Sequence, residues 1–272
     1  MYLATQDKPF FPSDFREKFA LVKQLGFDAF EIDGKILRDH HAEIEKASLA
    51  AGLPVRMVCG GYTGWIGDFS EEKRRICLKE ITEILKICGG LDIGGIVVPA
   101  AWGMFSLRLP PMTPPRTAAE DRKVLLDSLA VLDRAAGETG THLFLEPLNR
   151  YENHMILLVE EAVSLINEGK FSNVLVTADF YHMNIEEAHI EKTLEKFAAH
   201  IGHIHLASSQ RLEPGAGHLD YLPGFKALHK NGYEGGFCFE CRVLAEDPKA
   251  AYSASVGVVK HQLKKAGYIG LV

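Results

Sequence analysis

The sequence has no apolar run near the ~20 residues that a membrane-spanning helix requires. Its first residues, MYLATQDKPF, lack the basic stretch and long apolar stretch of a secretory signal. The five cysteines are odd in number and scattered, which indicates reduced thiols rather than a disulfide framework. The net charge of −6 argues against a nucleic-acid-binding surface. These absences predict a cytoplasmic protein that binds neither membranes nor nucleic acids.

Cys238 and Cys241 form a CxxC spacing without the second cysteine pair that a typical zinc site would need. They span a predicted strand, where residues three positions apart face opposite sides. We therefore expect both cysteines to have a structural role.

Strand and helix signals alternate along all 272 residues, with no linker or low-complexity segment, which predicts one domain over residues 1–272. The first four predicted strands are residues 2–5, 29–32, 54–58 and 94–98, and four more end at or near Glu146, Asp179, His205 and Glu240. The predicted helices are residues 12–26, 39–52, 71–88, 117–140, 155–168, 185–199, 222–230 and 247–266.

Eight strand–helix units predict a parallel sheet that closes into a (β/α)8 TIM barrel of the α/β class. The alternative fold is a doubly wound open sheet. That fold would normally open on a glycine-rich phosphate turn after the first strand, and the sequence has none there.

Four successive apolar strands carry a metal-binding residue type near their carboxyl ends: LFLE at Glu146, VLVTAD at Asp179, GHIHLA at His205 and GGFCFE at Glu240. One acidic residue after a strand is commonly a helix cap or a surface charge. Four in register, about one strand–helix unit apart, predict a cluster at the barrel mouth. Two Glu, one Asp and one His suit Mn²⁺, Mg²⁺ or Co²⁺, with Zn²⁺ as a further alternative.

The longest predicted loop, residues 99–116, is rich in proline and carries Trp102, Met104 and Phe105. Long loops with exposed aromatic residues often act as lids over a site. The alternative is that Trp102 packs on a neighbouring helix.

Four segments carry a resemblance to a known family: LEPLNRYE at 145–152, DFYHMNIEE at 179–187, HIHLASSQRLEPGAGH at 203–218 and FE at 239–240. They resemble the xylose-isomerase-like barrels and, within these, the D-tagatose/D-psicose 3-epimerase group of ketose 3-epimerases. The resemblance covers the second half of the chain well and the first half mainly by its layout.

The resemblance implies a metal, with Mn²⁺ as the expected ion, held by Glu146, Asp179, His205 and Glu240. It implies that Glu146 and Glu240 are also the catalytic acid–base pair.

The resemblance also implies a small-molecule sugar substrate bound by Glu152, His182 and Arg211, to which we add Trp102 from the long loop. Proteins of this family often form homodimers or homotetramers.

These residues suit epimerisation at C3 of a ketose. A metal on the carbonyl and a neighbouring hydroxyl would stabilise the enediolate formed when the C3 proton is removed. Glu146 and Glu240 on opposite faces could remove and return that proton, while His182 and Arg211 stabilise the negative charge. Glu152 would orient the hydroxyl end of the substrate.

Several structural interpretations compete with these roles. His182 could be a first-turn helix residue, and Arg211 could pair with Glu213 on the surface, where such pairs contribute little. We expect structural roles for His142, His203 and His218.

Three other functions compete with the ketose 3-epimerase. An aldose–ketose or hydroxypyruvate-type isomerase could use the same metal site. An endonuclease IV-type phosphodiesterase would need more histidines, whereas the second and third strands end in Glu31-Ile32-Asp33 and Cys59-Gly60-Gly61. A non-catalytic metabolite binder would not need two carboxylates beside a metal.

The GAGH segment at 215–218 could bind a phosphate, so a sugar phosphate is also a candidate substrate.

Overall fold

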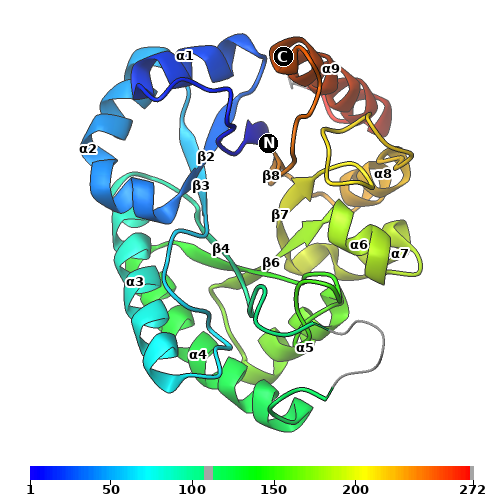
Figure 1. Ribbon diagram of the computed structural model, residues 1–272. Coiled ribbons are helices and arrows are strands. Elements are labelled where there is room, and N and C mark those ends of the chain that lie inside the picture. Colours follow the sequence, from blue (N-terminus) through cyan, green and yellow to red (C-terminus); the bar gives the residue numbers. More distant parts are fainter. Residues whose placement is uncertain (107–112, 270–272) are drawn as a thin grey trace.

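Eight parallel strands close into a barrel in the computed structural model, which describes residues 1–106 and 113–269 (Figure 1). Each strand pairs with the next along the chain, and the first pairs with the last, so no edge is left open. The strands are β1 (Tyr2–Thr5), β2 (Ala29–Asp33), β3 (Val55–Cys59), β4 (Gly95–Pro99), β5 (His142–Glu146), β6 (Val174–Asp179), β7 (Ile201–Leu206) and β8 (Gly236–Phe239).

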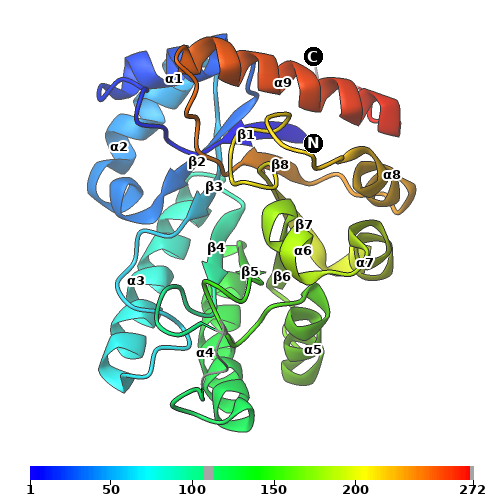
Figure 2. The same cartoon turned by 45° about the vertical axis from the view of Figure 1, so that its right-hand side comes forward.

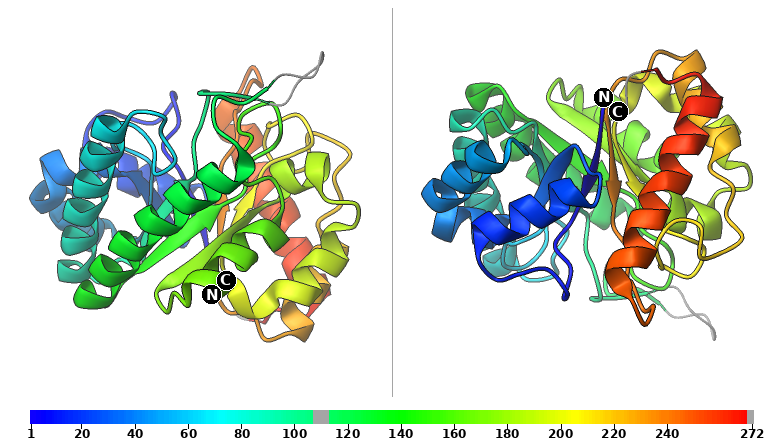
Figure 3. Two further views of the ribbon diagram at one scale, coloured as in Figure 1. Left: turned by 90° about the horizontal axis from the view of Figure 1, so that it is seen from below. Right: turned by 90° about the horizontal axis from the view of Figure 1, so that it is seen from above.

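Helices surround the strands on the outside of the barrel (Figures 1 and 3). The described part of the chain contains α1 (Phe15–Gln24), α2 (Gly34–Ala51), α3 (Glu71–Gly90), α4 (Ala118–Thr139), α5 (Val159–Gly169), α6 (Phe180–Glu186), α7 (Ile190–Phe197), α8 (Leu222–Lys230) and α9 (Pro248–Ala266). The predicted (β/α)8 TIM barrel is confirmed. Among the described helices, none is both long and apolar enough to span a membrane.

The helix predicted over residues 185–199 is wrong in its bounds and its number. The structure has two α-helices there, α6 and α7, followed by a short 3-10 turn at Ala198–His200. Asp179 caps α6, because its side chain accepts hydrogen bonds from the backbone N–H groups of Tyr181 and His182. The first of the two helices therefore begins directly after β6, and the described helices number nine rather than eight.

The helix predicted from residue 39 also begins earlier, at Gly34, directly after β2. Asp33 is its N-cap and accepts from the backbone N–H groups of Lys35 and Ile36. A non-helical backbone conformation at His40 kinks α2 near the predicted start. The sequence signal therefore found the second part of this helix and missed its first turn.

The start and the end of the chain are joined through aromatic packing. Figure 2 shows α9, drawn in orange to red, lying beside α8. Tyr252 of α9 is fully buried and its ring lies 5.2 Å from that of Phe27, which precedes β2. The same ring lies 5.5 Å from that of Phe239 at the end of β8. These contacts pack α9 against the residue segment before β2 and against the end of β8.

The barrel interior is packed with side chains. Ala4, Ala29 and Cys238 form one small apolar group there. Met57, Val97 and Phe144 form a second. Cys238 and Cys241 are both buried and form no disulfide. The packed interior leaves the carboxyl ends of the strands as the place where polar side chains can meet a ligand.

Candidate active site

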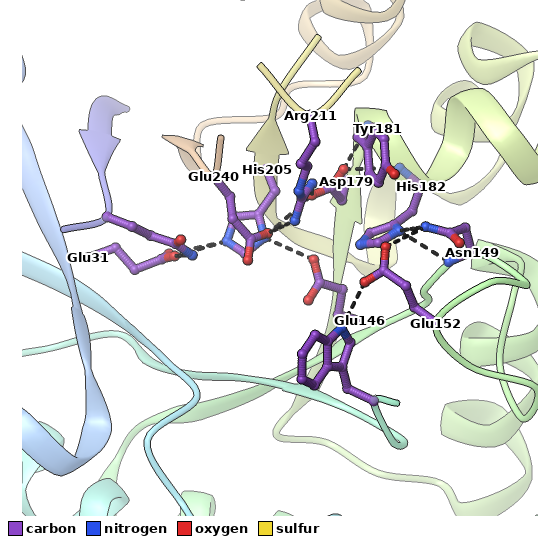
Figure 4. A network of polar contacts seen from close by, with 12 residues as sticks. Glu31, Glu146, Asn149, Glu152, Asp179, Tyr181, His182, His205, Arg211 and Glu240 are labelled. Carbon is purple, nitrogen blue, oxygen red and sulfur yellow. Dashed lines mark hydrogen bonds and ion pairs between the residues drawn. The ribbon is translucent and has the colours of Figure 1, made fainter. Parts of the chain in front are cut away.

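The four sequence-predicted ligands converge at the carboxyl ends of neighbouring strands (Figure 4). Glu146 ends β5, Asp179 ends β6, His205 lies in β7 and Glu240 directly follows β8. One donor atom from each lies within 4.8 Å of the others. Glu146, Asp179 and His205 are buried, and Glu240 keeps 22% of its side chain exposed. The strand-end pattern in the sequence thus corresponds to one compact cluster in space.

The donor set of this cluster fits a divalent cation. The Nδ1 atom of His205 lies 2.9 Å from Glu146 Oε1, 2.8 Å from Glu240 Oε2 and 3.9 Å from Asp179 Oδ2. One ring nitrogen carries at most one hydrogen and cannot satisfy three carboxylates. Within residues 1–106 and 113–269, Glu240 Oε2 makes no hydrogen bond of acceptable geometry despite its close neighbours. A cation among these atoms would compensate their combined negative charge.

The two glutamates of the cluster differ in their affinity for a proton. Burial and, after it, the negative charge of Glu240 raise the pKa of Glu146 to about 8. Burial also acts to raise the pKa of Glu240, but the positive charges of Arg211 and His205 bring it well below its ordinary value. Carboxyl groups whose environments separate their pKa values are suited to the roles of acid and base.

Arg211 faces the cluster rather than Glu213. Its Nη1 atom lies 2.5 Å from Asp179 Oδ2, and its Nη2 atom lies 2.6 Å from Glu240 Oε2. The guanidinium group stacks over the ring of Tyr181, with 4.8 Å between its central carbon and the ring centroid. Arg211 therefore places a fixed positive charge beside two of the four candidate ligands.

His182 lies in the first turn of α6 and is also buried beside the site. Its Nδ1 atom accepts a hydrogen bond of 3.1 Å from the backbone N–H of Asn149. A backbone N–H can only donate, so Nδ1 carries no hydrogen and a neutral ring carries it on Nε2. Burial lowers the pKa of His182, which favours this neutral form. The side chain is thereby prepared as a neutral donor through Nε2.

Asn149 connects His182 to Glu152. Its amide nitrogen lies 2.8 Å from His182 Nδ1 and 2.8 Å from Glu152 Oε1. Asn149 lies in the LEPLNRYE segment, where the sequence predicted no role for it. Its partner His182 is on another element, so local spacing carried no signal for it.

Trp102 is 55% exposed and contacts a site residue instead of packing on a helix. Its indole Nε1 donates a hydrogen bond of 2.8 Å to Glu152 Oε2. Its ring centroid lies 6.4 Å from that of Trp65, in the loop after β3. The structure thus places Trp102 at the rim with Glu152. Residues 107–112 of the predicted lid lie outside the described residues.

Glu31, on β2, is a second residue that the sequence argument overlooked. Its carboxylate contacts the Nε2 atoms of both His203 and His205. The available signal was the charged residue inside the apolar strand AFEID. His203 is buried and contacts Glu31, and the structural role expected for it stays a prediction. His142 begins β5, at the end of the barrel opposite the cluster. His218 contacts Ser209.

A closed barrel of parallel strands with three carboxylates and one imidazole at their carboxyl ends defines a TIM barrel with a candidate metal centre. The chain belongs to the xylose isomerase-like TIM barrel family, whose model matches residues 19–262.

Relatives with known activities include epimerases of two kinds. The chain is 48% identical over 256 residues to a 3-dehydro-D-guloside 4-epimerase from Escherichia coli (strain K12), covering 94% of this chain and 98% of the relative. It is 32% identical over 237 residues to a D-psicose 3-epimerase from Ruminiclostridium cellulolyticum, covering 84% and 78%. The crystal structure of apo 3-keto-D-glucoside 4-epimerase from E. coli superposes with a TM-score of 0.94, at 47% identity over 96% and 99% of the chains.

Proposed function

We propose that the protein is a sugar epimerase that inverts the hydroxyl-bearing carbon next to a ketone, with 3-keto-glycosides as substrates and C4 as the inverted carbon. The observation that carries this proposal is the placement of Glu146 and Glu240 beside the same His205 nitrogen. They come from β5 and β8, which lie on either side of the β6–β7 pair. Two carboxylates arranged in this way can serve opposite faces of one substrate carbon.

The chemistry begins with a C–H group next to a ketone, whose loss of a proton gives an enediolate. A divalent cation held by the four candidate ligands would supply a Lewis acid for the keto oxygen and the neighbouring hydroxyl oxygen. One of the two glutamates removes the proton from one face, and the other delivers a proton to the opposite face, which inverts the carbon. Arg211 and the neutral donor His182 stabilise the developing negative charge.

The relatives favour the glycoside over the free ketose. Both substrates contain an α-hydroxy ketone: C3 is the keto carbon and C4 is inverted in the first, whereas C2 is the keto carbon and C3 is inverted in the second. The 48% identity to the 4-epimerase spans nearly all of both chains. The D-psicose 3-epimerase matches at 32%. Epimerisation of a ketose at C3, the prediction from the sequence, therefore remains as the second candidate.

Proton exchange in D₂O tests the proposal. Mn²⁺-loaded protein would be incubated with a methyl 3-keto-glucoside, ketohexoses, ketopentoses, their phosphates and hydroxypyruvate, and NMR would locate the deuterium after metal removal. We expect deuterium at C4 of the keto-glycoside together with the C4 epimer. Deuterium at C3 of a ketose would establish the second candidate instead. Deuterium at C1 or C2 with an aldose or aldehyde product would establish an isomerase, and no exchange would refute all three.

Removal of the metal is expected to abolish epimerisation and lower the melting temperature. Without the cation, the carboxylates of Glu146, Asp179 and Glu240 repel one another around His205. A ligand at 100 times its dissociation constant stabilises a fold by about 2.7 kcal/mol. Activity, metal content and thermal unfolding would be measured after chelation and again after addition of Mn²⁺, which should restore all three. Full activity in protein shown to be metal-free would contradict the proposed role of the cation.

A further inference from the structure

The side chain of Glu31 lies inside the barrel, beside the candidate metal centre and fully shielded from solvent. Figure 4 shows it on the opposite side of the His205 ring from Glu146. Three nitrogen atoms surround its carboxylate. Gln6 Nε2 lies 2.8 Å from Oε1, His203 Nε2 lies 2.7 Å from Oε2, and His205 Nε2 lies 3.0 Å from Oε1. These donors satisfy a group that would be costly to bury alone.

The position of Glu31 determines which nitrogen of His205 can bind a cation. A carboxylate facing Nε2 accepts the ring hydrogen at that nitrogen. Nδ1 is the ring nitrogen that faces Glu146, Asp179 and Glu240. A hydrogen held on Nε2 leaves the lone pair on Nδ1 available for the cation.

His203 strengthens this arrangement from the other side of the carboxylate. Its Nε2 atom forms a hydrogen bond with Glu31 Oε2. Its ring also packs edge-on against the His205 ring, with centroids 5.0 Å apart and an angle of 81° between the ring planes. The ring of His205 is thus restrained both by the Glu31 carboxylate and by a neighbouring ring. Such contacts fix the tautomer and the direction of a metal-binding imidazole.

Glu31, His203, His205 and Cys238 lie close enough together to suggest a second metal site. The geometry argues against it, because both imidazoles turn their Nε2 atoms to the Glu31 carboxylate and thereby use them as donors. Cys238 packs with Ala4 and Ala29 in an apolar group. The group is therefore better described as a support for His205.

We propose that Glu31 is a positioning residue that holds the His205 ring with Nε2–H toward the carboxylate and Nδ1 toward the metal. This inference rests on the proposed metal centre. Loss of such an outer contact typically weakens metal binding by about 10–100-fold. Glu31 is fully buried and contacts His205 through Nε2, so its effect on the metal centre passes through His205.

Variants at Glu31 test the inference through metal affinity. We expect Glu31→Ala to raise the Mn²⁺ dissociation constant of the metal-free protein by about 10–100-fold, measured by titration calorimetry. Glu31→Gln should retain more affinity, because its oxygen can still accept from Gln6 and His205. Its amide would face His203, whose other ring nitrogen, Nδ1, has no hydrogen-bond partner in the described part of the chain and can take the hydrogen. Gln6→Ala removes one donor to Glu31 but leaves the carboxylate beside His205, so it should weaken Mn²⁺ binding less than Glu31→Ala does.

A second measurement reads the His205 ring directly and needs no variant. In ¹⁵N-histidine-labelled protein loaded with diamagnetic Zn²⁺, long-range ¹H–¹⁵N NMR should find the hydrogen on Nε2 of His205. A hydrogen on Nδ1 would overturn the inference, as would Mn²⁺ affinity in a folded Glu31→Ala protein equal to that of the unmodified protein. If the unmodified protein bound neither Mn²⁺ nor Zn²⁺, the proposed metal centre itself would be refuted.

Discussion

Replacement of either carboxylate of the proposed acid–base pair is expected to slow inversion strongly while leaving proton exchange on one face. In Glu240→Gln, Glu146 can still remove and return a proton on its own side of the substrate. In Glu146→Gln, the other epimer should exchange instead. Each variant should lose about 10²–10⁴-fold in epimerisation, the usual contribution of a positioned acid or base. Deuterium incorporation into each separate epimer would be followed by NMR at saturating Mn²⁺.

A matched control separates this effect from a general loss of charge. Glu213→Gln makes the same glutamate-to-glutamine change two residues from Arg211. Neither of the two ion pairs of Arg211 involves Glu213. It should epimerise at the unmodified rate. Metal content must be measured in all variants, because Glu146 and Glu240 are also candidate ligands. Exchange from both epimers at equal rates in a metal-loaded Glu240→Gln protein would contradict the assignment of one carboxylate to each face.

The sequence was sufficient for those parts of the site that depend on position along a strand. Glu146, Asp179 and Glu240 close apolar runs or follow them directly, and parallel strands bring their carboxyl ends together. Glu31 was missed because its partners are His203 and His205, far along the chain. The same holds for Asn149, whose partner His182 begins a different element. Local spacing does not encode a contact between distant segments.

The break between α6 and α7 has a similar cause. The segment EEAHIEKTLEKFAAH contains no glycine or proline and consists mainly of residues compatible with a helix, so its local preference predicts one continuous helix. In the structure, Glu187 accepts from the backbone N–H of Val159, at the start of α5, and from the hydroxyl of Thr193. These tertiary contacts stabilise an extended conformation at Glu187, which ends α6. Propensity is a weak influence when such contacts compete with it.

Asp179→Asn and Asp179→Ala are expected to separate metal binding from helix capping. Asp179 Oδ1 accepts from the backbone N–H groups of Tyr181 and His182, at 2.7 and 3.1 Å. Its Oδ2 faces Arg211. In the Asn variant, the amide oxygen should stay at the cap, which directs the NH₂ group toward Arg211 and the cation. Both variants should therefore lose at least about 100-fold in Mn²⁺ affinity, or ~2.7 kcal/mol, by calorimetry.

The two variants should differ in stability. Loss of an N-cap side chain costs about 1 kcal/mol, so metal-free Asp179→Ala should unfold at lower urea concentration than metal-free Asp179→Asn. The cap also begins the helix that carries His182, so the Ala variant should disturb the contact between His182 and Asn149, and the Asn variant should preserve it. Equal stability of the two would contradict the capping role. Unchanged Mn²⁺ affinity in Asp179→Asn would remove Oδ2 from the proposed ligand set, since an amide NH₂ cannot replace a carboxylate oxygen on a divalent cation.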